Sequence, residues 1–207
     1  MRTSINLAVY IAVIGAALLI GNGVYALNAY YDIEIDRINK PNRPLPSGRI
    51  EPQRALRYAW SLMILGMTVA IVVSILTLNS IMILLWSAFT LLGVGYSVPP
   101  LKLKRRHIFG NLCFGAFAGL SYVLIGAIYR PASFYQEWWL YAIIVTIYVA
   151  GIITMKDFYD VEGDKANGDI TLPVKIGRKG AAAISILLIG LDLVLNYVAY
   201  PPKDILT

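Results

Sequence analysis

Cysteine and histidine are almost absent from this sequence. Its 207 residues contain one cysteine, Cys113, and one histidine, His107. A single cysteine excludes an intramolecular disulfide framework and a multi-cysteine metal site. A single histidine weakens every mechanism that depends on a histidine cluster, relay or triad. The reactive groups therefore have to be sought among other side chains.

Charged residues are also scarce, at 14% of the chain, which is roughly half of their usual share in soluble domains. Hydrophobic residues make up 58%, and the mean hydropathy is +0.66. This excess indicates that lipid is the solvent. The net charge of +6 would also suit a nucleic-acid binder. The basic residues, however, lie in short polar segments between long apolar runs, so we expect membrane lipid and not nucleic acid around this protein.

Six apolar runs can be drawn along the chain, each of roughly the 17–25 residues that span a bilayer as a helix. They cover residues 5–29, 55–78, 81–96, 110–129, 138–154 and 181–200, the third being short. No linker separates two soluble domains. The sequence predicts an all-α polytopic membrane helix bundle with about six transmembrane helices.

The basic residues predict the orientation of this bundle. The long connections follow the first, third and fifth runs, so an even zigzag places all of them on one side. That side then carries 15 of the 18 Lys and Arg residues, and only Arg2, Arg130 and Lys203 remain for the other. The positive-inside bias predicts a multi-pass cell-membrane protein whose loops 37–54, 97–109 and 161–180 are cytoplasmic.

An acidic stripe follows the first run. Asn28, Asp32 and Asp36 are spaced i, i+4, i+8, and they share one face if the helix continues through them. Two carboxylates and an amide oxygen on one face suit a hard divalent cation such as Mg²⁺.

A second acidic stripe follows the fifth run at the same predicted depth. Asp157, Asp160 and Asp164 are spaced i, i+3, i+7, again on one face. Stacked carboxylates near helix C-termini repel one another and oppose the helix dipole unless a cation is present. Solvated helix-end charges are the alternative interpretation. Two such stripes favour a shared metal site over that alternative.

Two Pro-rich basic loops lie between the acidic stripes, at 39–49 and 96–106. Basic groups beside Mg²⁺-binding carboxylates are typical of a diphosphate site. We interpret Lys40, Arg43 and Lys102 as ligand contacts, and Arg105 and Arg106 as ordinary positive-inside charge.

Aromatic residues in the later spans have two possible roles. Trp138 and Trp139 open the fifth run and suit the aromatic belt at the membrane interface opposite the loops. Tyr122, Tyr141 and Tyr148 fall within spans, where core packing is the favoured interpretation and shielding of a carbocation is the alternative.

Four ordered motifs resemble the UbiA superfamily of intramembrane prenyltransferases, over residues 21–177. They are Asn28-x3-Asp32-x3-Asp36, Asn39-Lys40-Pro41-x-Arg43-Pro44, Tyr96-Ser97-x-Pro99-Pro100-x-Lys102-x-Lys104 and Asp160-x3-Asp164. The resemblance implies two Mg²⁺ ions that hold a prenyl diphosphate between the acidic motifs. Loss of diphosphate would leave an allylic carbocation, which a lipophilic acceptor attacks.

The resemblance also assigns roles to residues of this chain. It implies that the catalytic carboxylates are Asp32, Asp36, Asp160 and Asp164. The implied metal ligands are these four with Asn28 and Asp157. The implied diphosphate contacts are Asn28, Lys40, Arg43, Tyr96, Lys102, Lys104 and Lys156.

The chain departs from the family in two respects. The family usually has Asp after the first Asn, where this chain has Ala29. The family also usually has nine helices, and the six runs match its second to seventh. We therefore expect residues 1–207 to form a single transmembrane prenyltransferase domain that lacks the family's first helix and last two helices. A fragment, a truncated gene product and a partner-dependent short form all fit that pattern.

Within the family, the stretch 39–49 looks most like archaeal digeranylgeranylglyceryl phosphate synthases. That likeness implies transfer of a geranylgeranyl group to geranylgeranylglyceryl phosphate in ether-lipid biosynthesis. Chlorophyll synthases and aromatic-acceptor members are the alternatives within the family. A cation transporter and a non-catalytic scaffold are the alternatives of another class. The oligomeric state is left open.

Overall fold

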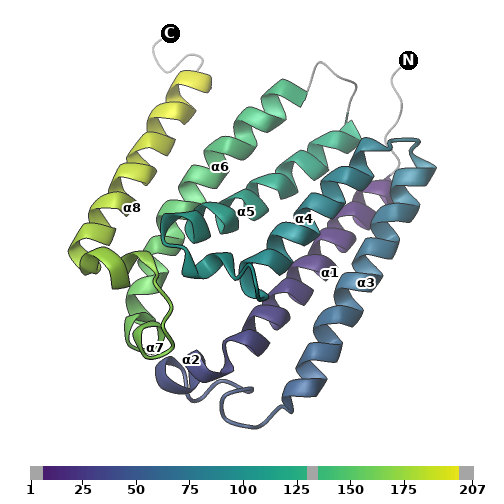
Figure 1. Cartoon of the computed structure of the whole chain (residues 1–207). Helices are drawn as coiled ribbons and strands as arrows, with labels where there is room; N and C mark the ends of the chain where they lie inside the picture. Colours follow the sequence, from purple (N-terminus) through teal and green to yellow (C-terminus); the bar gives the residue numbers. More distant parts are fainter. Residues whose placement is uncertain (1–6, 130–134, 201–207) are drawn as a thin grey trace.

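The computed structural model describes residues 7–129 and 135–200 and is built from helices (Figure 1). The six long helices are α1 (Leu7–Tyr31), α3 (Pro52–Leu76), α4 (Ile81–Ser97), α5 (Ile108–Tyr129), α6 (Tyr135–Lys156) and α8 (Leu172–Ala199). The short helices are α2 (Ile33–Asn39) and α7 (Val161–Ala166), and 3₁₀ turns occupy Leu103–Arg105 and Asp157–Tyr159. Within the described ranges no strand forms, apart from one isolated bridge between Arg106 and Ile170.

The predicted all-α membrane bundle is confirmed. Each of the six apolar runs became one long helix. Five helices of the described chain are long and apolar enough to cross a membrane, and α4, with 17 residues, is the shorter one that the sequence also predicts. The protein is therefore a multi-pass membrane protein.

The sixth helix begins earlier than predicted. The sequence predicts a loop over 161–180, yet this segment holds α7 and the first turns of α8. Pro173 lies in the first turn of α8, where a missing N–H costs nothing. Gly177 then breaks the helical backbone with φ 76° and ψ 163°, so α8 has a kink between its polar start and its apolar length.

Small residues let the long helices approach one another closely. A Cβ atom at Gly115 or Gly119 of α5 would collide with the backbone carbonyl of Thr146 or Ala142 on α6. In lipid, where burial of apolar surface gives no driving force between helices, such close packing is what holds helices together. The backbones of α5 and α6 therefore lie in close contact.

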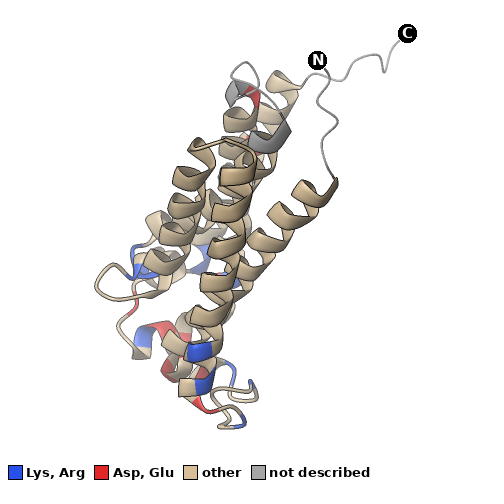
Figure 2. Ribbon diagram, turned by 90° about the vertical axis from the view of Figure 1, so that its right-hand side faces the viewer, with Lys and Arg blue, Asp and Glu red and all other residues tan. Residues whose placement is uncertain are grey.

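The charged residues gather at one end of the bundle. Figure 2 shows most Lys, Arg, Asp and Glu residues at its lower end, below helices that carry few charges. In Figure 1 the short helices α2 and α7 lie side by side at this end, and the two motifs that precede them meet there.

Candidate functional site

Each acidic motif breaks its helix at its middle aspartate. Asp32 has φ −103° and ψ 7°, and Asp160 has φ −102° and ψ 0°. These nearly identical values lie in the sparsely populated bridge region, which is common at functional sites. The uninterrupted helix that the first stripe assumes is therefore absent. The N–H of Asp36 still donates to the carbonyl of Asp32 at 2.7 Å, so the stripe keeps nearly one face.

Asn39 joins the two short helices that follow these breaks. Its Nδ2 donates to the carbonyl of Asp160 at 2.9 Å, and its Oδ1 accepts from the N–H of Gly163 at 3.0 Å. That N–H belongs to the first turn of α7 and has no partner within its own helix. The side chain of Asn39 thus caps the N-terminus of α7. A capping residue is normally next to its helix in sequence, whereas Asn39 is 124 residues from Gly163.

Gly163 is required at this contact for a steric reason. A Cβ atom there would collide with the Asn39 amide and would lie 2.8 Å from the carbonyl oxygen of Ile35. Only glycine lets α2 and α7 lie this close. Their separation, in turn, determines how far apart the two acidic motifs stand.

Eleven of the twelve predicted site residues line one small cavity of about 50 Å³. They are Asn28, Asp32, Asp36, Lys40, Arg43, Tyr96, Lys104, Lys156, Asp157, Asp160 and Asp164. Lys102 is the exception, since it is not among the lining residues and takes a left-handed conformation with φ 35°. The structure thus brings the two stripes together, while their functional roles stay predictions.

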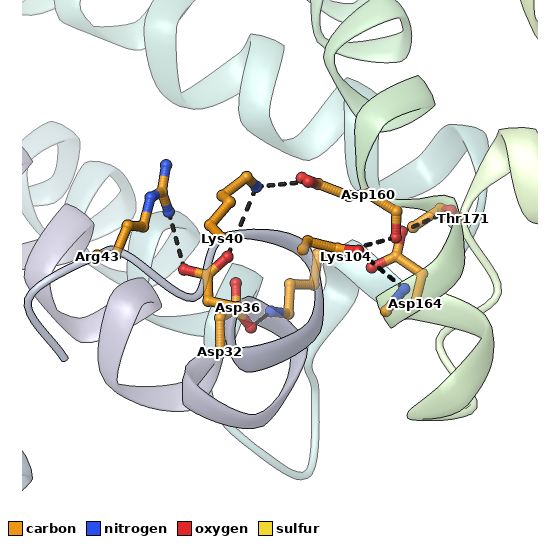
Figure 3. A network of polar contacts seen from close by, with 10 residues as sticks. Asp32, Asp36, Lys40, Arg43, Lys104, Asp160, Asp164 and Thr171 are labelled. Atoms are coloured by element: carbon orange, nitrogen blue, oxygen red, sulfur yellow. Dashed lines mark hydrogen bonds and ion pairs between the residues drawn. The ribbon is translucent and has the colours of Figure 1, made fainter. Parts of the chain in front are cut away.

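Lysine and arginine side chains bridge the carboxylates of the cavity (Figure 3). Lys40 Nζ lies 2.5 Å from Asp160 Oδ1 and 3.6 Å from Asp36 Oδ1, so a single ammonium group spans both motifs. Arg43 donates to Asp36 Oδ2 at 2.8 Å, and Lys104 pairs with Asp32. The carboxylates of the cavity are therefore paired with cationic side chains, and the ammonium group of Lys40 lies between the two motifs.

Three residues of this site were given no role in it from the sequence. Asp169, 2% exposed, lines the cavity and pairs with Arg105, which the sequence analysis treats as ordinary loop charge. Thr171 donates to Asp164 Oδ2 at 3.0 Å. The third is Asn39. Asp169 lies at no helical spacing from the predicted carboxylates. Asn39 is i+3 from Asp36 and Thr171 is i+7 from Asp164, so spacing is the signal that could have pointed to these two.

His107 directly follows the second basic loop and has a structural contact. Its backbone N–H donates to the carbonyl of Ile170 at 3.2 Å, and its ring Nδ1 lies 2.6 Å from the same oxygen. This contact ties the loop that carries Lys104 to the segment that carries Asp169.

The residues of the cavity fit a magnesium ion by the chemistry of their donor atoms. Carboxylate and amide oxygens are the ligands that this hard cation prefers. Asn28 donates its Nδ2 to Ser97 Oγ at 3.1 Å, which leaves its carbonyl oxygen as a ligand atom. No three carboxylates of residues 7–129 and 135–200 stand close enough together to form a compact metal cluster. Lys40 instead contacts one carboxylate of each motif, Asp36 and Asp160.

Burial shifts pKa values at this end, those of Asp164 and Lys104 among them. Desolvation raises the pKa of Asp164 to about 6, and the nearby Asp160 and Asp169 add to this shift, while the hydrogen bond from Thr171 opposes it. Desolvation lowers the pKa of Lys104 to about 8, against the attraction of Asp169 and Asp164. Asp164 therefore titrates close to neutral pH.

This titration predicts a pH dependence of metal binding. Stabilisation of the purified protein by Mg²⁺, measured as a rise in Tm, should be full above about pH 7 and should fade as pH drops through about 6, because a protonated carboxyl cannot ligate the ion. Without metal, the stability of the protein changes with pH in the opposite direction. The folded-state pKa lies above the ordinary aspartate value of 3.8, so stability falls as pH rises towards about 6. Asp164→Asn should weaken both effects, and a Mg²⁺ response of the unchanged protein that stays the same at low pH would contradict this assignment.

The fold and the site together define a polytopic membrane protein with an acidic, lysine-bridged cavity at one end of its bundle. The model of the UbiA prenyltransferase family matches residues 2–204, and the chain belongs to that family.

The chain is similar to several digeranylgeranylglyceryl phosphate synthases. It is 35% identical to the enzyme of Methanosphaera stadtmanae over 84% of this chain and 60% of the relative. It is 34% identical to that of Methanobrevibacter smithii over 97% of this chain and 69% of the relative. The chloroplastic chlorophyll synthase of rice is 32% identical, over 77% of this chain and 43% of the relative. The chain thus spans about 60% of the length of the first of these relatives.

Solved structures share the fold. A digeranylgeranylglyceryl phosphate synthase structure has 28% identity and a TM-score of 0.68, covering 95% of this chain and 66% of the other. A UbiA homologue from Aeropyrum pernix has 25% identity and a TM-score of 0.74, covering 96% and 74%. A UbiA homologue from Archaeoglobus fulgidus, bound to GPP and Mg²⁺, has 21% identity and a TM-score of 0.75, covering 98% and 70%.

Proposed function

We propose that this protein catalyses Mg²⁺-dependent transfer of a geranylgeranyl group from its diphosphate to geranylgeranylglyceryl phosphate. The observation that carries the proposal is the convergence of two acidic motifs on one cavity, with Lys40 bridging Asp36 and Asp160. The relatives named as digeranylgeranylglyceryl phosphate synthases support this acceptor. The Archaeoglobus fulgidus homologue bound to GPP and Mg²⁺ supports the metal and the donor class.

Two Mg²⁺ ions are proposed at the site. The residues that would hold them are Asn28, Asp32, Asp36, Asp157, Asp160 and Asp164. When bound, the metal supplies positive charge for the departing diphosphate.

The cationic side chains are proposed to hold the phosphate oxygens. Lys40, Arg43 and Lys104 already face the carboxylates, and Lys156 lines the same cavity. Fixed positive charge at the place where negative charge develops is, in many enzymes, the largest single contribution to stabilising the transition state. Lys102 is a weaker candidate, because it is not among the residues that line the cavity.

The proposed reaction replaces the allylic C–O bond of the donor with an ether C–O bond to the acceptor. The allylic C–O bond of the donor breaks, and the diphosphate leaves with the electron pair. The hydroxyl oxygen of the acceptor then bonds to the allylic carbon, its O–H bond breaks, and the proton passes to the departed diphosphate. The apolar helices keep water from reaching the cation first.

A cation transporter fits the site less well. A path for cations gains nothing from Lys40, Arg43 and Lys104, which point ammonium and guanidinium groups at the carboxylates. These groups fit a site where an anion arrives together with a divalent metal.

Incubation with labelled geranylgeranyl diphosphate tests the proposed function. We expect product with geranylgeranylglyceryl phosphate in the presence of Mg²⁺ and none when the metal is chelated. Product with an aromatic acid alone would move the protein to the quinone branch of the family. Binding of neither donor nor acceptor would overturn the proposal and favour a non-catalytic scaffold.

The cytoplasmic location of the site is a further prediction. Cysteines introduced as Lys102→Cys and Lys175→Cys should react with an impermeant maleimide only from the inner side of sealed vesicles. Leu78→Cys, at the 93% exposed turn between α3 and α4, should react only from the outer side. The unchanged protein is the control, because its sole cysteine, Cys113, is buried. Labelling of Lys102→Cys and Lys175→Cys from opposite sides would refute this orientation.

A further inference from the structure

A second pocket lies at the end of the bundle opposite the acidic cavity. It has a volume of about 430 Å³ and is lined by Tyr122 and Ile125 of α5, Glu137, Trp138 and Tyr141 of α6, and Tyr200 just after α8. Helices α5 and α6 and the residue that follows α8 thus contribute four aromatic side chains and one carboxylate to a single pocket.

The tyrosine rings of this pocket line it with their planes inclined to one another, and they are not stacked face to face. Tyr122 and Tyr141 have ring centroids 5.4 Å apart with planes at 59°, and Tyr141 and Tyr200 are 6.0 Å apart with planes at 71°. Core rings of this protein show both arrangements, since Phe89 and Phe117 stack at 4.1 Å and 11°, whereas Trp86 and Phe89 meet at 5.9 Å and 82°. The three tyrosines are also 36–46% exposed, so part of each remains accessible to a ligand.

The indole ring of Trp138 lines the pocket and packs against α5. A Cβ atom at Gly126 would collide with its indole ring, so glycine allows the ring to lie directly against α5. Its Nε1 is buried and has no hydrogen-bond partner in the part of the chain that the structure describes. Trp139, its neighbour, is 45% exposed and borders a different, apolar groove. The belt interpretation therefore suits Trp139, whereas Trp138 belongs to the pocket.

Glu137 gives the pocket its charge. The carboxylate is exposed and forms no ion pair within the described residues. Aromatic faces attract cations through their quadrupole, and they bind best those cations that give up water easily. An alkylated ammonium meets that condition, whereas a small, strongly hydrated metal ion does not.

We propose that this pocket binds an organic ammonium group, held by the faces of Tyr122, Tyr141 and Tyr200 and by the carboxylate of Glu137. The site is separate from the acidic cavity and does not depend on prenyl transfer. The same ammonium chemistry could come from a zwitterionic lipid headgroup or from a soluble amine.

Choline and its neutral isostere 3,3-dimethyl-1-butanol test the charge requirement. The full chain in a non-ionic detergent is titrated with each, and binding is followed by saturation-transfer NMR on the ligand methyl signal. We expect saturable binding of choline and none of the neutral alcohol. Equal binding of the two would show only apolar partitioning and would overturn the proposal.

Variants locate the site. Glu137→Gln and Tyr141→Leu should each weaken choline binding by about fivefold or more. Tyr148→Leu is the matched control, because Tyr148 is another half-exposed tyrosine of α6 that does not line the pocket, and it should bind like the unchanged protein. Glu137 is on the surface, so Glu137→Gln remains informative if Tyr141→Leu fails to fold. Unchanged binding by Glu137→Gln would also overturn the proposal.

Lipid nanodiscs distinguish the two sources of the ammonium group. The protein is reconstituted in an equal mixture of phosphatidylcholine and phosphatidylglycerol, and retained lipids are counted by native mass spectrometry. Preferential retention of phosphatidylcholine, lost in Glu137→Gln, identifies a lipid headgroup. Choline binding without this preference identifies a soluble ammonium ligand.

Discussion

Asp160→Asn should lower kcat for prenyl transfer by about 10³-fold. The substitution keeps the size of the side chain and removes one negative charge from the cavity that both motifs share. Asp160 also holds Lys40, whose Nζ lies 2.5 Å from its Oδ1, so the bridge between the two motifs is lost as well. The measurement is single-turnover formation of the prenylated product at saturating labelled geranylgeranyl diphosphate and Mg²⁺.

Glu34→Gln is the matched control for this experiment. Glu34 is another acid at this end, on α2, but its side chain is 67% exposed and pairs with Arg37 outside the cavity. Its removal should leave kcat unchanged. If Asp160→Asn raised only the KM for the donor and kept kcat, the carboxylate would contribute to binding alone and the proposed catalytic role would be wrong.

Gly163→Ala should lower activity by about 10²-fold while the helical content is retained. The added methyl group collides with the Asn39 amide and meets the Ile35 carbonyl, so α7 must move away from α2. A displacement of about 1 Å between groups that act together typically costs this much. The same collision should destabilise the protein by about 1–3 kcal/mol, the usual cost of overpacking. Product formation and thermal unfolding in detergent measure the two effects.

Gly190→Ala is the control for this substitution. It introduces the same methyl group into a helix, at a position of α8 where a Cβ atom meets nothing within 4 Å. Activity and stability should both be kept. Asn39→Ala should reproduce much of the Gly163→Ala effect, because it removes the hydrogen bonds that join the two helices. Normal activity in both variants would show that the spacing of α2 and α7 does not control the site.

The sequence alone was sufficient to predict the long helices and the acidic stripes. Hydrophobic length is a local property, so each apolar run predicts its own helix without reference to its neighbours. The spacing of Asn28, Asp32 and Asp36 is likewise local, and it survives the break at Asp32 because backbone hydrogen bonds continue across it.

Contacts between distant segments were decided only by the tertiary structure. Asn39 caps α7 from 124 residues away, and Asp169 meets Arg105 because two polar loops fold against each other. Lys102 carries the same charge as Lys104, yet only Lys104 lines the cavity. Lys102 and Lys104 have the same charge and lie in the same loop, so the sequence could not show which of the two lines the cavity.

The aromatic pocket shows the same division. Tyr122 and Tyr141 were each assigned to core packing, which is the commoner role for an aromatic residue within a span. Their convergence with Glu137 and Tyr200 depends on how α5, α6 and α8 meet, and it cannot be derived from any one helix. The sequence by itself determined which segments enter the membrane, because solvation by lipid acts on each segment separately. The tertiary structure decided which side chains face one another, because that depends on packing between segments far apart in the chain.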